Sequence, residues 1–144
     1  MITCTRRLTF CAGHRVMGHE NKCAHLHGHN YVVELTAAAQ LDGVGRVIDF
    51  SVLKARLGGW IDAHWDHGFI LHRGDEDARR AVESFAPREG EPQKLYLMAD
   101  NPTAENMAQY LLLEVCPPLF ADTGIAIVRA VVHETENCHA TAAL

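Results

Sequence analysis

The sequence predicts an α+β fold in which an antiparallel sheet carries two helices packed on one face. Three observations lead to this prediction: segments typical of strands occur in pairs, single helical patterns separate these pairs, and the joining turns are short. The protein has 144 residues and is 48% hydrophobic. This length is enough for one compact core, so we expect a single domain over residues 1–144.

The first half of the sequence contains the two longest predicted strands. Residues 2–12 alternate polar and apolar side chains and lead to His14, and residues 27–38 form the second strand. A Gly-containing turn at 42–45 precedes a short predicted strand at 46–50. Ser51 can then cap a helix. Its predicted apolar face comprises Val52, Leu53, Leu57, Trp60, Ile61 and His64. The pair Gly58-Gly59 weakens the helix prediction.

The second half repeats the pattern with shorter strands. We expect strands at 69–71 and 94–98, and between them the charged segment 72–93 is either a surface insertion or carries a short helix around 76–85. A helix opens at 102–105 and runs until Pro117-Pro118 stops it, with an apolar side formed by Met107, Leu111, Leu112 and Val115. The alternation at 125–134 predicts a further strand, and a last one follows Asn137.

Composition excludes several classes of function. The net charge of −5 and isoelectric point near 6.0 provide no positive field for phosphates, so no nucleic acid partner is expected. Residues 1–7 lack the pattern of a secretory signal, and no stretch approaches about 18 uninterrupted apolar residues, so we expect no membrane association and a cytoplasmic location. The five cysteines have no spacing typical of a disulfide scaffold.

Seven of the ten histidines fall into two groups, residues 14–29 and 64–67. Side chains alternate along a strand, so His27 and His29 point to the same face with their Cα atoms about 7 Å apart. His14 faces them if the two long strands pair antiparallel. Three imidazoles with no required fourth protein ligand are typical of a catalytic zinc site with an open position.

Three other interpretations of the histidines remain open. The imidazoles could simply be solvated or hydrogen-bonded at strand ends. Cys23 could supply a fourth ligand, which would give a closed structural site with an inert thiolate. His19 and His25 could also compete as ligands, since His25 has the same strand parity as His27.

Several motifs together carry a family resemblance. The sequence resembles the 6-pyruvoyl-tetrahydropterin synthase and 6-carboxy-tetrahydropterin synthase family over nearly its whole length, in the segments FCAGH at 10–14, CAHLHGH at 23–29, VIDF at 47–50 with Leu53-Lys54, Asp66-His67, PTAEN at 102–106 and HET at 133–135. The resemblance implies a tunnelling fold (T-fold) that assembles into an oligomeric barrel, a homo-hexamer of stacked trimers. Trp65 and the long 72–93 segment depart from the family's sequence pattern. Both departures concern the shape of the opening through which the substrate would enter.

The resemblance also implies a zinc-dependent reaction on a dihydropterin triphosphate. Zinc at the three histidines would make the C–H groups beside the substrate's hydroxyls more acidic, and Cys23 would be the base, because a thiolate is favoured near a cation. Asp66 and His67 would form a proton-exchanging dyad that a neighbouring subunit lends to the site. Without the resemblance, the same pair could be an ordinary surface turn, and as neighbours on a strand they would need a backbone bend to meet.

Substrate recognition is expected from the last strand and the second helix. The carboxylate of Glu134 can accept two parallel hydrogen bonds from the aminopyrimidinone edge of a pterin, and the family also implicates it in proton relay. Thr103 and Glu105 lie in the matched helix start and are secondary candidates, because carboxylates also stabilise helix starts without a ligand. Arg15 and Lys22 flank the site and could meet a triphosphate.

Three functions follow from these expectations. Three residues separate Cys23 from His27, and this gap resembles the carboxy-forming branch of the family, which acts on 7,8-dihydroneopterin triphosphate, releases acetaldehyde and triphosphate, and leads to queuosine. The alternative is the pyruvoyl-forming lyase, which eliminates triphosphate from the same substrate. A non-catalytic protein that binds zinc and pterin is the second alternative.

Overall fold

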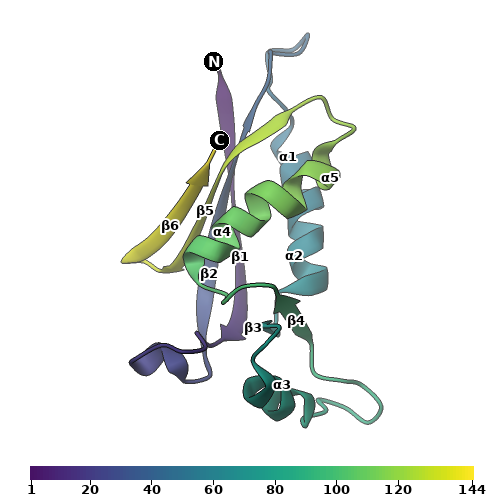
Figure 1. The fold of residues 1–144 in the computed structure, drawn as a ribbon. Helices are drawn as coiled ribbons and strands as arrows, with labels where there is room; N and C mark the ends of the chain where they lie inside the picture. The colour runs from purple at the N-terminus through teal and green to yellow at the C-terminus, as the bar shows by residue number, and fades with distance from the viewer.

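The computed structural model describes residues 1–144 and contains one six-stranded sheet in the order β4-β3-β1-β2-β5-β6 (Figure 1). The strands are β1 (Thr3–His14), β2 (His27–Ala38), β3 (Gly68–His72), β4 (Leu95–Met98), β5 (Ala126–Thr135) and β6 (Cys138–Ala143). Two long helical runs cover one face of the sheet, and α3 (Glu76–Glu83) lies beyond the end that carries β3 and β4 (Figure 1).

Each long helical run contains a π-helical turn in its middle. The first run consists of α1 (Phe50–Leu53), a π turn (Lys54–Gly58) and α2 (Gly59–His64). The second run consists of α4 (Ala104–Tyr110), a π turn (Leu111–Val115) and α5 (Cys116–Phe120). A 3-10 turn (Lys22–Ala24) lies in the connection between β1 and β2.

The core lies between the sheet and these helices. Tyr31, Val33 and Leu35 of β2 are fully buried, since every second residue of the strand faces the helices. They share one cluster of 23 buried residues with the apolar faces of both runs, which include Leu53, Leu57, Ile61, Met107, Ala108 and Leu111. Phe10 of β1 stacks on Tyr31 with ring centroids 4.9 Å apart, so the central strand pair is fixed by side-chain packing as well as by hydrogen bonds.

The sheet is mixed, which corrects the expectation of a purely antiparallel one. β1, β2, β5 and β6 are antiparallel neighbours, as expected. However, β3 pairs parallel with β1, with Ala12 opposite Gly68, and β4 pairs parallel with β3. The helical run between β2 and β3 takes the backbone from the Thr3 end of β1 to its His14 end, where β3 pairs with it. α3 and the loop after it lie between β3 and β4 and return the backbone to the end from which a second parallel strand can start. Alternation in a sequence gives no information on strand direction.

Two local predictions in the first half were wrong. Residues 46–50 form no strand, because the Asp42 carboxylate accepts hydrogen bonds from the backbone N–H groups of Val44 and Arg46 and holds a turn. The helix cap is Asp49 rather than Ser51, since the Asp49 carboxylate accepts from the Ser51 backbone and hydroxyl. The helix does pass through Gly58-Gly59, and the buried face contains Leu53, Leu57 and Ile61, while His64 is exposed.

The second long helix also departs from expectation. Pro117 and Pro118 do not end it, since α5 continues to Phe120. The two prolines stand in the first turn of α5, directly after the π turn, where missing N–H groups remove few regular hydrogen bonds. No helix of the structure has the length and apolar character needed to cross a membrane.

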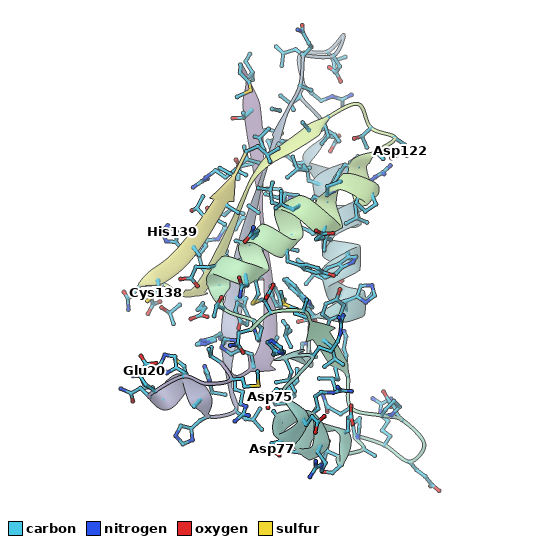
Figure 2. All side chains as sticks on the ribbon, viewed as in Figure 1. Glu20, Asp75, Asp77, Asp122, Cys138 and His139 are labelled. Carbon is cyan, nitrogen blue, oxygen red and sulfur yellow. The ribbon has the colours of Figure 1, made fainter.

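The charged 72–93 segment contains the expected short helix, and one ion pair anchors it to the sheet. The Arg15 guanidinium, which follows β1, donates two 2.5 Å hydrogen bonds to the Asp75 carboxylate at the start of α3, where Figure 2 labels Asp75. Asp75 is 2% exposed and also caps α3. The hydrogen bonds from Arg15 hold the pKa of Asp75 below its usual range.

We predict that Asp75→Asn lowers the free energy of unfolding by about 2–3 kcal/mol at pH 7, because it leaves Arg15 without its partner while keeping the capping oxygen. A quarter of the Arg15 side chain is exposed, which reduces the expected loss. The pKa of Asp75 is depressed in the folded state. The ion pair therefore stabilises above the unfolded pKa of about 3.9, and this contribution is lost as pH falls through the folded value.

Urea denaturation at fixed protein concentration measures both effects. The difference between the parent protein and Asp75→Asn should shrink as pH is lowered below about 4. Glu91→Gln, which removes the exposed Arg88–Glu91 pair, is the matched control and should change stability by less than about 0.5 kcal/mol. Equal effects of the two substitutions would contradict the anchoring role of Asp75.

Candidate metal centre

Three histidines converge where β1 ends and β2 begins. In the antiparallel register His14 lies opposite His27 and Ala12 lies opposite His29, so all three imidazoles are on the face that carries the helices. Their candidate ligand nitrogens lie within 4.8 Å of one another. His14 is the most enclosed of them, with 1% of its surface exposed. The expected juxtaposition of these three residues is therefore present.

The hydrogen bonds of two rings fix which nitrogen carries the proton. His14 Nδ1 donates to the Pro102 carbonyl at 2.8 Å, and His27 Nδ1 donates to the His25 carbonyl at 2.7 Å. A carbonyl oxygen only accepts, so in the neutral rings both Nε2 atoms present lone pairs. These two atoms face each other at 3.1 Å, and the buried His29 Nε2 has no hydrogen-bond partner. One cation shared by the three nitrogens satisfies all of them, so the residues fit a zinc ion.

The electrostatics keep the rings in the form that binds metal. Burial lowers the pKa of His14 to about 4, and the neighbouring histidines add to this effect, although the bond to Pro102 opposes it. Burial also lowers the pKa of His29, while the Glu134 carboxylate works in the opposite direction. His14 is therefore neutral near pH 7, as a metal ligand must be.

Glu134 is the carboxylate closest to this group. Its Oε2 lies 3.9 Å from His29 Nε2, so the end of β5 contributes to the same site. The other substrate candidates are placed differently. The Thr103 hydroxyl caps α4 by accepting from the Asn106 N–H at 3.2 Å, and Glu105 is exposed in the first turn of that helix.

Cys23 is near the group in sequence but does not join it. It lies in the 3-10 turn between β1 and β2 and is partly exposed. Its thiol makes no hydrogen bond, and it is absent from the set of ligand atoms that lie within 4.8 Å of one another. His19 and His25 are also outside this set, although the His25 carbonyl orients His27. The geometry thus favours an open three-histidine arrangement over one closed by Cys23.

Asp66 and His67 meet through the backbone bend that adjacent residues require. His67 has a φ of 59°, an uncommon conformation for a residue with a side chain, and its Nδ1 lies 2.8 Å from Asp66 Oδ2. Burial acts to raise the pKa of Asp66, but hydrogen bonds from His67 and from the Cys11 backbone hold it below its usual range. The pair is therefore a charged carboxylate that orients an imidazole.

This pair and the three histidines lie on opposite sides of β1. The His67 ring contacts the Cys11 thiol at 3.7 Å. Cys11 pairs with Asn30 and alternates with the residues that face the helices, so its thiol points to the other face. Within one protomer, the structure does not bring Asp66-His67 together with Cys23 or with the three histidines.

Several supporting residues were not found from the sequence. The Asn101 side chain makes two 2.9 Å hydrogen bonds with the Met17 backbone and so ties the β1–β2 connection to the start of α4. Asn106 in turn donates to the Asn101 carbonyl. This network positions the Pro102 carbonyl that holds His14. The only sequence signal was an asparagine directly before the Pro-Thr helix start.

The fold and the site together are a mixed sheet with helices on one face (Figure 1) and three histidines that could hold a metal ion where β1 ends and β2 begins. The 6-pyruvoyl tetrahydropterin synthase family model matches residues 3–143. The 6-carboxy-5,6,7,8-tetrahydropterin synthase of Rickettsia typhi is 47% identical over 139 residues, which cover 96% of this protein and 97% of the relative. The protein of the same name from Rickettsia bellii is 45% identical with the same coverage.

Solved structures agree on the fold. An uncharacterized protein from Wolinella succinogenes superposes with a TM-score of 0.82 at 22% identity, covering 99% of this protein and 97% of the other. The Caenorhabditis elegans 6-pyruvoyl tetrahydropterin synthase has a TM-score of 0.69 at 24% identity and coverage of 99% and 95%. The protein belongs to the 6-pyruvoyl tetrahydropterin synthase family, and the expected tunnelling fold is confirmed for the single protomer.

We predict that His27→Ala abolishes zinc binding, since it removes one of three ligands. His25→Ala is the matched control, because it deletes a neighbouring imidazole but keeps the carbonyl that orients His27. Elemental analysis after dialysis against limiting zinc measures the outcome, with circular dichroism to verify folding. Full zinc retention by His27→Ala, or equal loss in both variants, would contradict the assignment.

Proposed function

We propose that this protein is a zinc-dependent 6-carboxy-5,6,7,8-tetrahydropterin synthase. It acts on 7,8-dihydroneopterin triphosphate, releases acetaldehyde and triphosphate, and serves queuosine biosynthesis. The observation that carries the proposal is the set of three histidines whose ligand nitrogens lie within 4.8 Å of one another beside the Glu134 carboxylate, in a protein that matches relatives of this name over 96% of its length. The proposal includes a cytoplasmic location and no nucleic acid partner.

His14, His27 and His29 would hold the zinc, which supplies an electrophile that polarises the hydroxyl groups of the substrate. Glu134 would accept two hydrogen bonds from the pyrimidinone edge of the pterin. Because its carboxylate lies 3.9 Å from His29 Nε2, a pterin bound in this way would lie beside the metal. Thr103 and Glu105 remain secondary candidates for binding the substrate at the start of α4. Arg15 is already paired with Asp75, so it is a weaker candidate for the triphosphate than Lys22.

Cys23 would remove a proton from the hydroxylated arm of the bound substrate, since a cation nearby favours the thiolate. Asp66 would orient His67 and stabilise its protonated form, so that the ring can pass a proton to or from the reacting group. A single protomer keeps this pair on the far side of β1. A neighbouring protomer would therefore supply it to each site.

The sheet edges support such an assembly. β3 pairs with β1 only from Ala12 to His14, so the rest of that edge of β1 is unpaired, and β6 forms the opposite edge of the sheet. Cys138 and His139 lie on this outer strand (Figure 2). Unpaired edges are templates for pairing with another protomer. Edge-to-edge pairing of three protomers would close one trimeric barrel. Two stacked trimers would give the expected homo-hexamer with intersubunit sites.

The pyruvoyl-forming reaction is the second candidate, and the name of the matching family model favours it. We prefer the carboxy-forming reaction because three residues separate Cys23 from His27 and because relatives with that name match nearly the whole sequence. A non-catalytic protein that binds zinc and pterin is the third candidate. It accounts for the histidines and Glu134 but leaves the Asp66-His67 geometry without a purpose.

We predict that the zinc-loaded protein converts 7,8-dihydroneopterin triphosphate to the carboxypterin with release of acetaldehyde, as followed by mass spectrometry. Cys23→Ala should reduce the rate by about 10²-fold or more while zinc content stays unchanged. Cys138→Ala, on the outer strand, is the control and should retain full activity. A pyruvoylpterin product would establish the second candidate, and an unchanged substrate at full zinc occupancy would establish the third.

A mixing experiment tests the intersubunit site. We predict that Cys23→Ala and His67→Ala are each inactive, and that their co-expression restores activity in about a quarter of the sites, those that combine an intact Cys23 with an intact His67 of a neighbour. Co-expression of tagged with untagged Cys23→Ala is the negative control. No recovery in verified mixed oligomers would show that the pair serves its own protomer.

A further inference from the structure

A second group of potential metal ligands surrounds Cys11 on the face away from the helices. The Cys11 thiol lies 3.7 Å from both ring nitrogens of His67 and 3.9 Å from Asp66 Oδ1. The ligand atoms of the three residues all lie within 4.8 Å of one another. Thiolate, carboxylate and imidazole are the three ligand types that zinc accepts most readily in proteins.

The distances suit one tetrahedral ion. With Zn–S of about 2.3 Å and Zn–N or Zn–O of about 2.0 Å, the ligand atoms of a tetrahedron are separated by about 3.3–3.6 Å. The measured separations from the sulfur exceed this by only a few tenths of an ångström. His67 Nδ1 lies 2.8 Å from Asp66 Oδ2 and 3.7 Å from the Cys11 sulfur, so it is the ring nitrogen that can share an ion with both residues, and it would exchange its hydrogen bond to Asp66 for the metal.

The backbone holds these three residues together independently of their side chains. The Cys11 N–H donates to Asp66 Oδ1 at 3.1 Å, and the His67 N–H donates to the Cys11 carbonyl at 2.7 Å. The positive φ of His67 turns its ring back toward Asp66 and Cys11. Beside them lies a cavity of about 410 Å³, where Gly13 and Gly28 contribute no side chains. A cation can therefore reach the group and keep an open coordination position.

We propose that Cys11, Asp66 and His67 form a second divalent-cation site, distinct from the three-histidine centre, that binds zinc when zinc is in excess. Thiolate and carboxylate together neutralise the charge of the ion, and the sulfur selects zinc, cobalt or cadmium over magnesium. An ion bound at this site is coordinated by Asp66 and His67. If the proposed function holds, excess zinc therefore inhibits the enzyme by withdrawing that pair from proton transfer.

Cobalt titration tests the site without any need for activity. The first equivalent of Co²⁺ fills the three-histidine centre, and a second equivalent produces a thiolate-to-cobalt absorption band in the near ultraviolet. Cys11→Ser should lose this band and the second equivalent. Cys23→Ser and Cys138→Ser, which each remove one thiol elsewhere, should keep both. A band that survives in Cys11→Ser, or that disappears in Cys23→Ser, overturns the site.

Zinc inhibition tests the consequence. The parent enzyme should lose activity as zinc rises above one equivalent, whereas Cys11→Ser should retain its basal rate and need at least about tenfold more zinc for the same loss. Identical inhibition curves, or a Cys11→Ser enzyme that is inactive without added zinc, overturn the inhibitory role. If no substrate is turned over but the cobalt result holds, the metal site stands and the proposed function fails.

Discussion

The antiparallel pairing of β1 with β2 sets the positions of the three candidate metal ligands. Its register runs without interruption from Thr3 opposite Ala38 to His14 opposite His27. A shift by one residue would turn His27 and His29 to the other face and separate them from His14. The packing of Phe10 on Tyr31 and the buried Val33 and Leu35 oppose such a shift, because it would expose the core side of both strands. The hydrophobic core therefore determines where the metal centre can form.

The same alternation divides the chemistry between two faces. The histidines and Glu134 lie on the helix side of the sheet, and Cys11 with Asp66-His67 lies on the other side. Burial keeps His14 neutral, and the carbonyls of Pro102 and His25 orient the rings of His14 and His27. A bend at His67 gives the Asp66 dyad its geometry. The proposed active site needs groups from both faces, so the proposal requires an assembly of several protomers.

Local patterns were enough to predict much of this arrangement. The spacing of His27 and His29 depends only on the period of a strand, and the strand at 27–38 was predicted with its observed ends. Features set by distant residues were not predicted. The contact of Cys11 with Asp66 depends on the parallel pairing of β1 and β3, and the burial of Asp75 depends on Arg15, 60 residues away. At Pro117-Pro118 a general rule failed, because a π turn had already changed the hydrogen-bond pattern.

In the proposed centre, three imidazoles bind the zinc and leave it open to substrate. X-ray absorption at the zinc edge, on protein loaded with one equivalent of zinc, tests this most directly. The proposed centre predicts a first shell of nitrogen and oxygen scatterers at about 2.0 Å, with the multiple-scattering pattern of three imidazoles and no sulfur. A sulfur scatterer at about 2.3 Å that disappears in Cys23→Ser would contradict it and establish a closed structural site.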